Sequence, residues 1–233
     1  MIYVTADIHG NYELYTKLLR LIRFSDEDTL YVLGDVVDRG REPMRVLLDM
    51  MARPNVIPLI GNHEVMALKS LRFLNTEISE ESLGALDEKT LEILLEWQGD
   101  GGEATMKDFA RLSSEEKEDV LDYLSEFSLY EELEVNGTDY VLVHAGLENF
   151  SPDRPLWDYE PAELLFTRAD YSIPCFPDRY LVTGHTPTLT IPGNPRPGYI
   201  YRANNHIAID CGCGYGQRLG ALCLDTGEEF YAE

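Results

Sequence analysis

The stretch that most constrains the fold of this chain is the apolar run at residues 30–33 together with the polar residues 34–40 that follow it. A continuous run of aliphatic and aromatic residues suits a strand that is buried on both faces of a sheet. Two carboxylates and an arginine, Asp35, Asp38 and Arg39, stand where that strand would end. Taken alone, the pattern also fits an ordinary Gly-Asp turn. Whether these residues are functional or only form a turn depends on the rest of the sequence.

Four further apolar runs end in the same way. The runs are residues 2–6, 56–60, 140–143 and 180–183, and the polar side chains that follow them are Asp7, His9, Asn62, His63, His144 and His185. Loops at the carboxyl ends of strands open onto a common crevice in an α/β sheet, so we expect these side chains to meet. Four of the five histidines stand at such ends, which purely structural histidines would not explain. The pattern predicts a site.

Carboxylate, amide and imidazole donors suit Mn, Fe or Zn in a hydrolytic centre rather than a structural thiolate site. Asp7 and His9 are two residues apart, so in extended backbone they point to the same side and can reach one ion. Cys211 and Cys213 lack the second pair that a zinc site needs, and we interpret them as part of a tight loop. The fifth histidine, His206, starts a strand and is interpreted as structural.

Composition limits the partners. The chain has 233 residues, 44% hydrophobic and 26% charged, which fits one α/β domain over residues 1–233. Its net charge of −23 argues against a nucleic-acid backbone and against an anionic membrane surface as partners. No apolar run approaches the ~20 residues that span a bilayer, and no signal-like segment opens the sequence. We therefore expect a cytoplasmic protein with reduced cysteines. The oligomeric state is left open.

Residues 65–130 have a different character, acidic and of helical period, and predict a helical cap on one face of the sheet, with helices near 65–74, 82–97 and 115–129. The glycine-rich break at 97–105 has neither the preceding strand nor the following lysine of a phosphate-binding loop, so we interpret it as a turn between helices. Trp97 and Trp157 are interpreted as core or cap packing.

The motifs together resemble the signature set of the calcineurin-like metallophosphoesterases, specifically the phosphoprotein phosphatase branch that includes bacterial serine/threonine phosphatases. They are Asp7-x-His9-Gly10, Gly34-Asp35-x-x-Asp38-Arg39-Gly40, Gly61-Asn62-His63-Glu64, His144-Ala145-Gly146 and Gly184-His185-Thr186, in the family's order. The resemblance implies a β-sandwich flanked by helices, in α/β/β/α layers, with the helical cap as an insertion.

The resemblance also implies a dinuclear metal centre. Asp7, His9 and Asp35 would hold the first ion, and Asp35, Asn62, His144 and His185 the second, with Asp35 bridging the two. The ions would be Mn, with Fe or Zn as alternatives. Two such ions, with Arg39 and a second arginine nearby, would outweigh the charges of Asp7 and Asp35, so we expect a locally positive crevice.

By the same resemblance, Arg39 would bind the substrate phosphate together with Asn62, and His63 would act as the general acid with Asp38 behind it. A second phosphate-binding arginine is expected between the last two histidine motifs. Arg168 is nominated because an apolar and aromatic run precedes it, although Arg154 and Arg179 lie in the same interval.

Three functions follow as hypotheses. The first is a metal-dependent phosphatase of phosphoserine, phosphothreonine or phosphotyrosine proteins or of small phosphoesters, in which water activated between two metals attacks phosphorus. The second is a dinucleoside polyphosphate hydrolase, with diadenosine tetraphosphate as its type substrate. The third is a metal-binding scaffold without activity. Asp38 and Glu64 favour the first, because the dinucleotide branch generally lacks a carboxylate at the position of Asp38. No metal ligand or motif histidine is missing, which disfavours the third.

Overall fold

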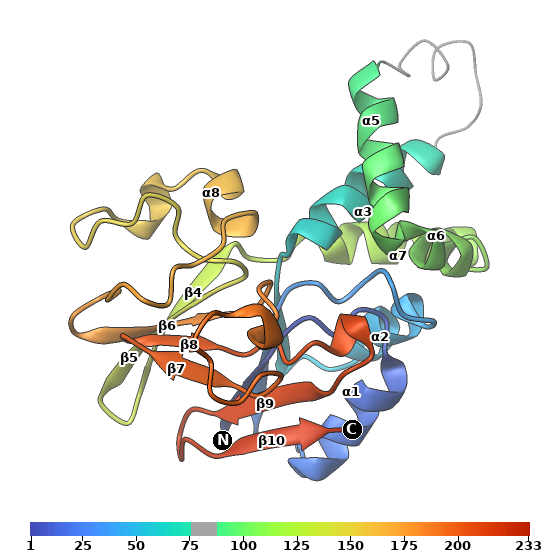
Figure 1. Ribbon diagram of the computed structural model, residues 1–233. Coiled ribbons are helices and arrows are strands. Elements are labelled where there is room, and N and C mark those ends of the chain that lie inside the picture. The colour runs from blue at the N-terminus through green and yellow to red at the C-terminus, as the bar shows by residue number, and fades with distance from the viewer. Residues whose placement is uncertain (76–87) are drawn as a thin grey trace.

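The structure, a computed structural model, describes residues 1–75 and 88–233. Two five-stranded sheets lie at its centre (Figure 1). The first has the order β10-β9-β1-β2-β3, with β1 (Ile2–Thr5), β2 (Thr29–Leu33), β3 (Val56–Leu59), β9 (Leu219–Cys223) and β10 (Glu229–Ala232). The second has the order β4-β5-β6-β8-β7, with β4 (Tyr130–Val135), β5 (Thr138–Val143), β6 (Arg179–Thr183), β7 (Tyr201–Ala203) and β8 (His206–Ala208).

Both sheets mix parallel and antiparallel strands: the first is antiparallel only on its β9 and β10 side, and the second is antiparallel at both edges. In the first sheet β1, β2 and β3 run parallel, with Leu30 opposite both Tyr3 and Val56. In the second sheet β5, β6 and β8 run parallel. Pro58 is tolerated because β3 is an edge strand, where a missing N–H costs no ladder bond. Six parallel strands therefore send their carboxyl ends, three from each sheet, toward one side.

The two sheets pack face to face over an apolar core. Val4 and Leu33 from the first sheet share this core with Leu142, Val182 and Ile207 from the second, and all five are buried. A buried side chain of this size contributes about 1.5–3 kcal/mol. The strands carry continuous apolar runs because their other faces are covered by helices or loops.

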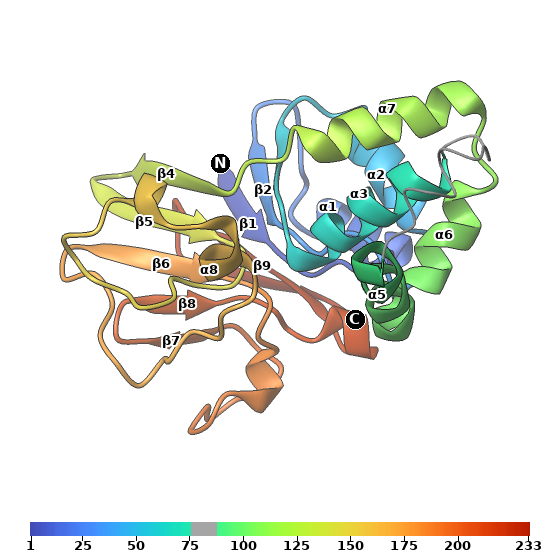
Figure 2. The same ribbon diagram turned by 90° about the horizontal axis from the view of Figure 1, so that it is seen from above.

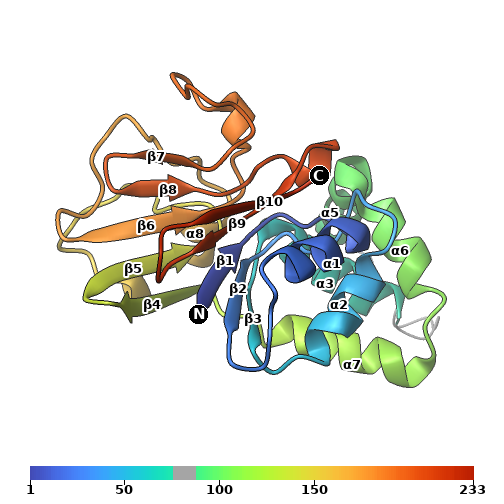
Figure 3. The same cartoon turned by 90° about the horizontal axis from the view of Figure 1, so that it is seen from below.

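Helices cover the outer face of the first sheet. Those on its side are α1 (Tyr12–Leu21), α2 (Pro43–Met51), α3 (Asn62–Leu74) and α7 (Ser114–Ser125), while α5 (Glu88–Trp97) packs on α3 and α6 (Glu103–Phe109) packs on α2. Figures 2 and 3 show them gathered beside β1, β2 and β3. The short α8 (Pro161–Leu165) and its neighbouring loops cover the second sheet, where Leu164 and Phe176 pack against Val141. The predicted α/β/β/α sandwich is confirmed.

The helical insertion is confirmed between β3 and β4, with different boundaries. Helix α3 begins at Asn62 rather than near residue 65, because Glu64 caps the free N–H of Gly61. The predicted helix 82–97 is described only from Glu88 onward; its first part lies outside the described residues. Helix α6 was not predicted, and α7 ends at Ser125 rather than near residue 129.

The side chain of Trp157 lies at the surface, and the four cysteines lie in the interior. The interpretation of Trp157 as packing was wrong, because the side chain is 75% exposed. All four cysteines are free and buried, as expected of reduced thiols. No helix in the described part of the chain is long and apolar enough to cross a membrane.

Candidate dinuclear metal centre

The predicted ligands converge where the carboxyl ends of the parallel strands meet. They come from both sheets: Asp7 and His9 follow β1, Asp35 follows β2, Asn62 opens α3 after β3, His144 follows β5 and His185 follows β6. All are buried except His185, which is partly exposed. The site therefore belongs to the junction of the two sheets and to neither sheet alone.

The backbone of the site is strained. Positive φ angles, which residues other than glycine seldom adopt, occur at Asp7, His9, Asp35, Asp38, Arg39 and His185, with values between 46° and 70°. The strained turns hold each other, since the N–H of Asp7 donates to the Gly34 carbonyl at 3.0 Å and that of His9 to the Asp35 carbonyl at 2.9 Å. Strain of this kind concentrates at functional sites, where the surrounding structure holds it in place.

Glycines precede several ligands because the loops approach very closely. A Cβ at Gly61 would lie 2.3 Å from Oδ1 of Asp35, and one at Gly184 would lie 2.2 Å from Oδ2 of Asp7. Any side chain there would push these carboxylates out of place. This explains why the sequence places glycine before Asn62 and before His185.

One group of donors closes around Asp35, His144 and His185. Nε2 of His144 lies 3.4 Å from Oδ1 of Asp35 and 3.2 Å from Nδ1 of His185. Oδ1 of Asn62 lies 3.0 Å from each of those two imidazole nitrogens. Because Nδ1 of His144 donates to the Leu33 carbonyl at 2.7 Å, its Nε2 carries a lone pair. Four lone-pair atoms thus face a common point, an arrangement that suits a cation.

A second group forms on the other side of Asp35. Oδ2 of Asp35 lies 3.7 Å from Nε2 of His9 and 3.8 Å from Nε2 of His63. His9 donates Nδ1–H to the Val37 carbonyl at 2.9 Å, so its Nε2 carries the lone pair that a metal would need. Both carboxylate oxygens of Asp7 accept from the main-chain N–H of His185. The atoms of this second group belong to His9, Asp35 and His63, and Asp7 is not among them. Asp7 therefore stays a predicted ligand.

Burial lowers the pKa of His9 and of His185 to about 3, so both imidazoles are neutral and can donate a lone pair. Burial raises the pKa of Asp7, and the nearby carboxylates of Asp210 and Asp35 raise it further. Buried carboxylates crowded beside neutral imidazoles fit cations bound between them. The donor set thus fits two metal ions that share Asp35.

The predicted pair of Asp38 and His63 is formed. Oδ2 of Asp38 lies 2.7 Å from Nδ1 of His63, and both side chains are buried. Burial lowers the pKa of His63, but Asp35, Asp100 and Asp38 together raise it to about 10. His63 is therefore a cation that points its second N–H away from Asp38. An imidazolium held in this way can donate a proton.

The helical insertion holds this pair from the other side. Nε1 of Trp97 donates to Oδ2 of Asp38 at 2.9 Å, and Oγ1 of Thr105 donates to Oδ1 at 2.5 Å. Trp97 is 1% exposed, so the predicted packing role is confirmed, but its N–H also fixes the carboxylate. The glycine-rich break between α5 and α6 is a turn, as predicted. We had not predicted that it reaches the site.

Arg39 lies across the mouth of the second group. Its Nη1 is 2.9 Å from Nε2 of His9, and its Nη2 is 3.0 Å from Nε2 of His63. The same Nη2 donates to Oδ1 of Asp100 at 2.9 Å, and the guanidinium stacks on the ring of Tyr215 with 4.8 Å to its centroid. The predicted phosphate anchor is therefore beside both the metal donors and His63.

Glu64 ties the two central loops together. Its buried carboxylate accepts from the backbone N–H groups of Asp35, Val36 and Val37 at 2.7–3.2 Å, and from that of Gly61 at 2.9 Å. Burial and the charge of Asp35 raise its pKa to about 7. Glu64 thus fixes the loop after β2 against the start of α3.

Sequence reasoning missed several residues of the site. Asp210 follows β8 as the other ligands follow their strands; it is buried, accepts from the N–H of Gly212 at 2.8 Å, and burial raises its pKa to about 7. Its signal, an apolar run that ends in Asp, was present. Asp100 and Tyr215 had no such signal. Asp38, Asp100 and Asp210 add carboxylates to the crevice beyond Asp7 and Asp35. The locally positive crevice depends on two bound metal ions and stays a prediction.

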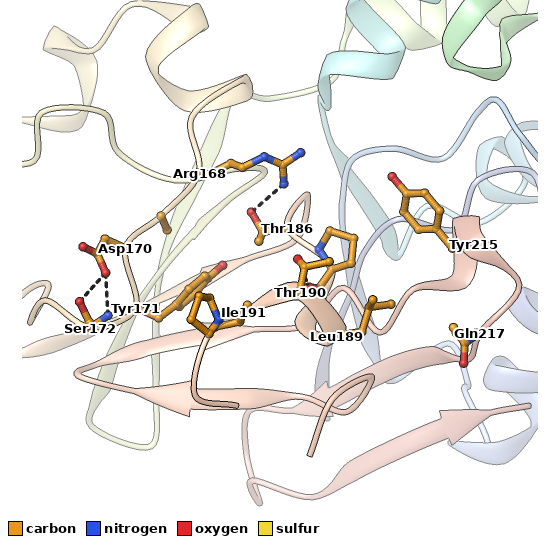
Figure 4. A pocket seen from close by; sticks show the side chains of 13 residues that line it. Arg168, Asp170, Tyr171, Ser172, Thr186, Leu189, Thr190, Ile191, Tyr215 and Gln217 are labelled. Atoms are coloured by element: carbon orange, nitrogen blue, oxygen red, sulfur yellow. Dashed lines mark hydrogen bonds between the residues drawn. The ribbon is translucent and has the colours of Figure 1, made fainter. Parts of the chain in front are cut away.

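Arg168 lies at the edge of a cleft beside the ligands. Its Nη1 lies 3.5 Å from Oγ1 of Thr186, the residue after His185 (Figure 4). Arg154 instead forms a two-point ion pair with Glu163, and Arg179 pairs with Glu132. The position of Arg168 supports its nomination over the other two arginines.

The cleft has a volume of about 870 Å³, and Tyr171, Leu189, Ile191 and Tyr215 provide much of its lining (Figure 4). Arg168 and Tyr215 line this cleft, and Tyr215 also stacks on Arg39, so both candidate phosphate-binding arginines lie near it.

Known enzymes resemble this chain in sequence. The symmetrical bis(5'-nucleosyl)-tetraphosphatase of Nitrosospira multiformis is 29% identical over 166 residues, which is 70% of this chain and 48% of the relative. The enzyme of the same description from Delftia acidovorans is 34% identical over 99 residues, 41% of this chain and 35% of the relative. Serine/threonine-protein phosphatase 2 of Salmonella typhimurium is 44% identical over 68 residues, 29% of this chain and 31% of the relative. The chain thus spans less than half the length of these relatives.

Solved structures share the fold. A candidate diadenosine tetraphosphatase has a TM-score of 0.64 at 20% identity and covers 99% of this chain and 91% of its own. A protein serine/threonine phosphatase from Saccharomyces cerevisiae has a TM-score of 0.59 at 16% identity, covering 100% and 79%. The family model for calcineurin-like phosphoesterases matches residues 1–206. With the fold, the shared Asp35 and the converging ligands, this match shows that the chain belongs to the calcineurin-like phosphoesterases, a family of metal-dependent hydrolases.

Proposed function

We propose that this protein hydrolyses phosphomonoesters, with phosphoserine and phosphothreonine proteins as the main substrate class and phosphotyrosine as a further one. The observation that carries the proposal is the 2.7 Å contact between Asp38 and His63, next to Arg39 and the shared carboxylate of Asp35. An acid that is held in its charged form is most useful where the leaving group is basic, as an alkoxide is.

Each group of the site has a separate role in the proposed reaction. Two metal ions, Mn by preference, would supply an activated water and would neutralise charge on the phosphoryl oxygens. Arg39 offers its planar guanidinium to the phosphate, and we assign Asn62 and Arg168 as further phosphate-binding residues. His63 gives its Nε2 proton to the leaving oxygen, while its Nδ1–H remains hydrogen-bonded to Asp38. Trp97 and Thr105 keep the Asp38 carboxylate in place for that transfer.

A dinucleoside tetraphosphate hydrolase is the second candidate, and the curated relatives favour it more than they favour the first. The apolar cleft beside Arg168 supports it as well, because a nucleoside attached to the phosphates would have a place to bind. Its leaving group, a nucleoside polyphosphate, is a far weaker base than an alkoxide and needs little help from His63. Asp38 therefore favours the first candidate, and the cleft and the relatives favour the second.

A substrate panel with the Mn-loaded protein separates the candidates. A phosphoserine peptide, a phosphotyrosine peptide and diadenosine tetraphosphate would be compared by kcat/KM, with the same reactions in chelator as the blank. The first candidate requires the highest value on a phosphopeptide. A preference for diadenosine tetraphosphate would replace it by the second, and no hydrolysis of any phosphoester would point to the metal-binding scaffold.

A further inference from the structure

The carboxylate of Asp100 lies between the two cations that would bind the substrate phosphate. Its Oδ1 accepts from Nη2 of Arg39 at 2.9 Å, and its Oδ2 lies 3.3 Å from Nε2 of His63. Carboxylate and phosphate oxygens make the same kind of contact with a guanidinium and an imidazolium. Asp100 thus occupies Nη2 of Arg39 and Nε2 of His63, two groups that the substrate phosphate would need.

The backbone of the turn that carries Asp100 is held in place, whereas the Asp100 side chain has open space into which it can rotate. The carbonyl of Gly101 accepts from the N–H of Arg39 at 3.1 Å, and a Cβ at Gly101 would lie 2.7 Å from Cγ of Arg39. Gly101 has φ +104°, so the close approach requires glycine. By contrast, the Asp100 side chain is 49% exposed and a Cβ at Gly99 would meet nothing within 4 Å.

Only the Asp100 side of this ion pair is open to solvent, with 49% exposure against 19% for Arg39, so water can solvate the carboxylate when the pair opens. Rotation of the Asp100 side chain toward solvent would free both cations without moving the backbone that Arg39 needs. The contact is therefore strong enough to occupy the phosphate position and weak enough to yield to a ligand.

We propose that Asp100 is a competitor for the phosphate position: its carboxylate binds Arg39 and His63 in the free enzyme, and an incoming phosphate has to displace it. The inference rests on the proposed function, since it assumes that phosphate binds at Arg39. It assigns the helical insertion a direct part in substrate affinity. Removing the Asp100 carboxylate should therefore tighten the binding of both inorganic phosphate and substrate.

The test measures binding of inorganic phosphate to the Mn-loaded protein by calorimetry, in the wild type, Asp100→Asn and Glu103→Gln. Glu103 is the matched control, because it is an exposed acid three residues away that pairs with Lys107 and not with the site. We expect the Kd for phosphate to fall about three- to tenfold in Asp100→Asn. It should change less than twofold in Glu103→Gln, where only the long-range field is altered.

Kinetics with p-nitrophenyl phosphate supply the second readout. KM should fall in parallel with the Kd in Asp100→Asn, and kcat/KM should rise. Unchanged or weaker phosphate binding would overturn the proposal, as would an equal gain in Glu103→Gln. So would a lower kcat with an unchanged Kd, because Asp100 would then be a positioning residue for His63. Near-UV circular dichroism checks that Asp100→Asn is folded. Asp100→Ser is the second variant at this position, and it should show the same tighter phosphate binding.

The two proposals can fail separately. If phosphate binds more tightly to Asp100→Asn although no phosphoester is hydrolysed by any form, the competitor stands and the proposed function falls. If the wild type hydrolyses phosphoesters and Asp100→Asn shows no tighter binding, the function stands and the competitor falls.

Discussion

Replacing Asp38 by Asn removes the charge that holds His63 as an acid while it keeps the size of the side chain. The carboxylate accepts hydrogen bonds from His63, Trp97 and Thr105. An asparagine has one oxygen and one NH₂ group, so at least one of these donors loses its acceptor. An unsatisfied buried donor costs about 1–3 kcal/mol, and each kcal/mol lowers the Tm of a chain of this size by about 2–4 °C.

The catalytic effect should depend on the leaving group. General acid catalysis contributes about 10²–10⁴-fold, and we expect Asp38→Asn to lose roughly 10- to 100-fold of that in kcat on phenyl phosphate or a phosphoserine peptide. On p-nitrophenyl phosphate the loss should be only a few-fold, because that leaving group needs little protonation. The assay is kcat across a series of aryl phosphates of increasing leaving-group pKa, which should give a steeper dependence in the variant.

Asp38→Asn should also shift the pH dependence of activity in a defined direction. Asp38 is one of the carboxylates that raise the pKa of His63 against the effect of burial, so its removal lowers that pKa. The loss of activity that accompanies deprotonation of His63 should therefore begin at a lower pH in Asp38→Asn. Thr105→Val is the comparison: it removes another contact of Asp38 but keeps the carboxylate charge, so it should lower the Tm and steepen the leaving-group dependence less than Asp38→Asn does. Equal losses on all leaving groups in Asp38→Asn would refute the assignment of His63 as the acid.

Three further predictions concern the supporting structure. Gly214→Ala would place a Cβ 2.2 Å from Cδ2 of His9, so affinity for the first Mn should fall about tenfold in a metal titration; Gly99→Ala, where a Cβ would meet nothing within 4 Å, should not change it. Glu64→Gln puts an amide among backbone N–H donors and should lower the unfolding free energy by about 1–3 kcal/mol in urea denaturation; an unchanged midpoint would count against its role between the loops. Burial lowers the pKa of His206, so the folded state binds its proton less readily than the unfolded state does. Stability should therefore fall as the pH drops through and below 6.5, and the fall should be shallower in His206→Gln, with equal slopes contradicting the reasoning.

The ligands could be predicted because strand geometry brings them together. An apolar run fixes a buried parallel strand, and the end of such a strand fixes where the next side chains point. Asp35 and His144 are 109 residues apart in sequence, yet both follow strands whose ends must meet. Asp210 obeys the same rule after β8, and the pattern was sufficient to find it.

The contribution of the insertion could not be predicted in this way. Trp97, Asp100 and Thr105 reach the site because helices α5 and α6 pack so that the turn between them lies on Arg39. No strand end fixes that position, and helical periodicity says nothing about which turn of a cap faces a site. Trp157 failed for a related reason, since an aromatic residue in a loop can lie on the surface without a pattern that reveals it.

Metal content measured together with activity tests the central claim most directly. The metal-free protein would be titrated with Mn, the bound ions counted by elemental analysis, and hydrolysis of p-nitrophenyl phosphate followed at each step. Two ions per chain are expected, with activity returning as the second one binds, and Asp35→Asn should bind fewer ions and stay inactive. Full activity with one ion per chain, or an Asp35→Asn variant that binds two ions and turns over normally, would contradict a dinuclear centre that shares Asp35.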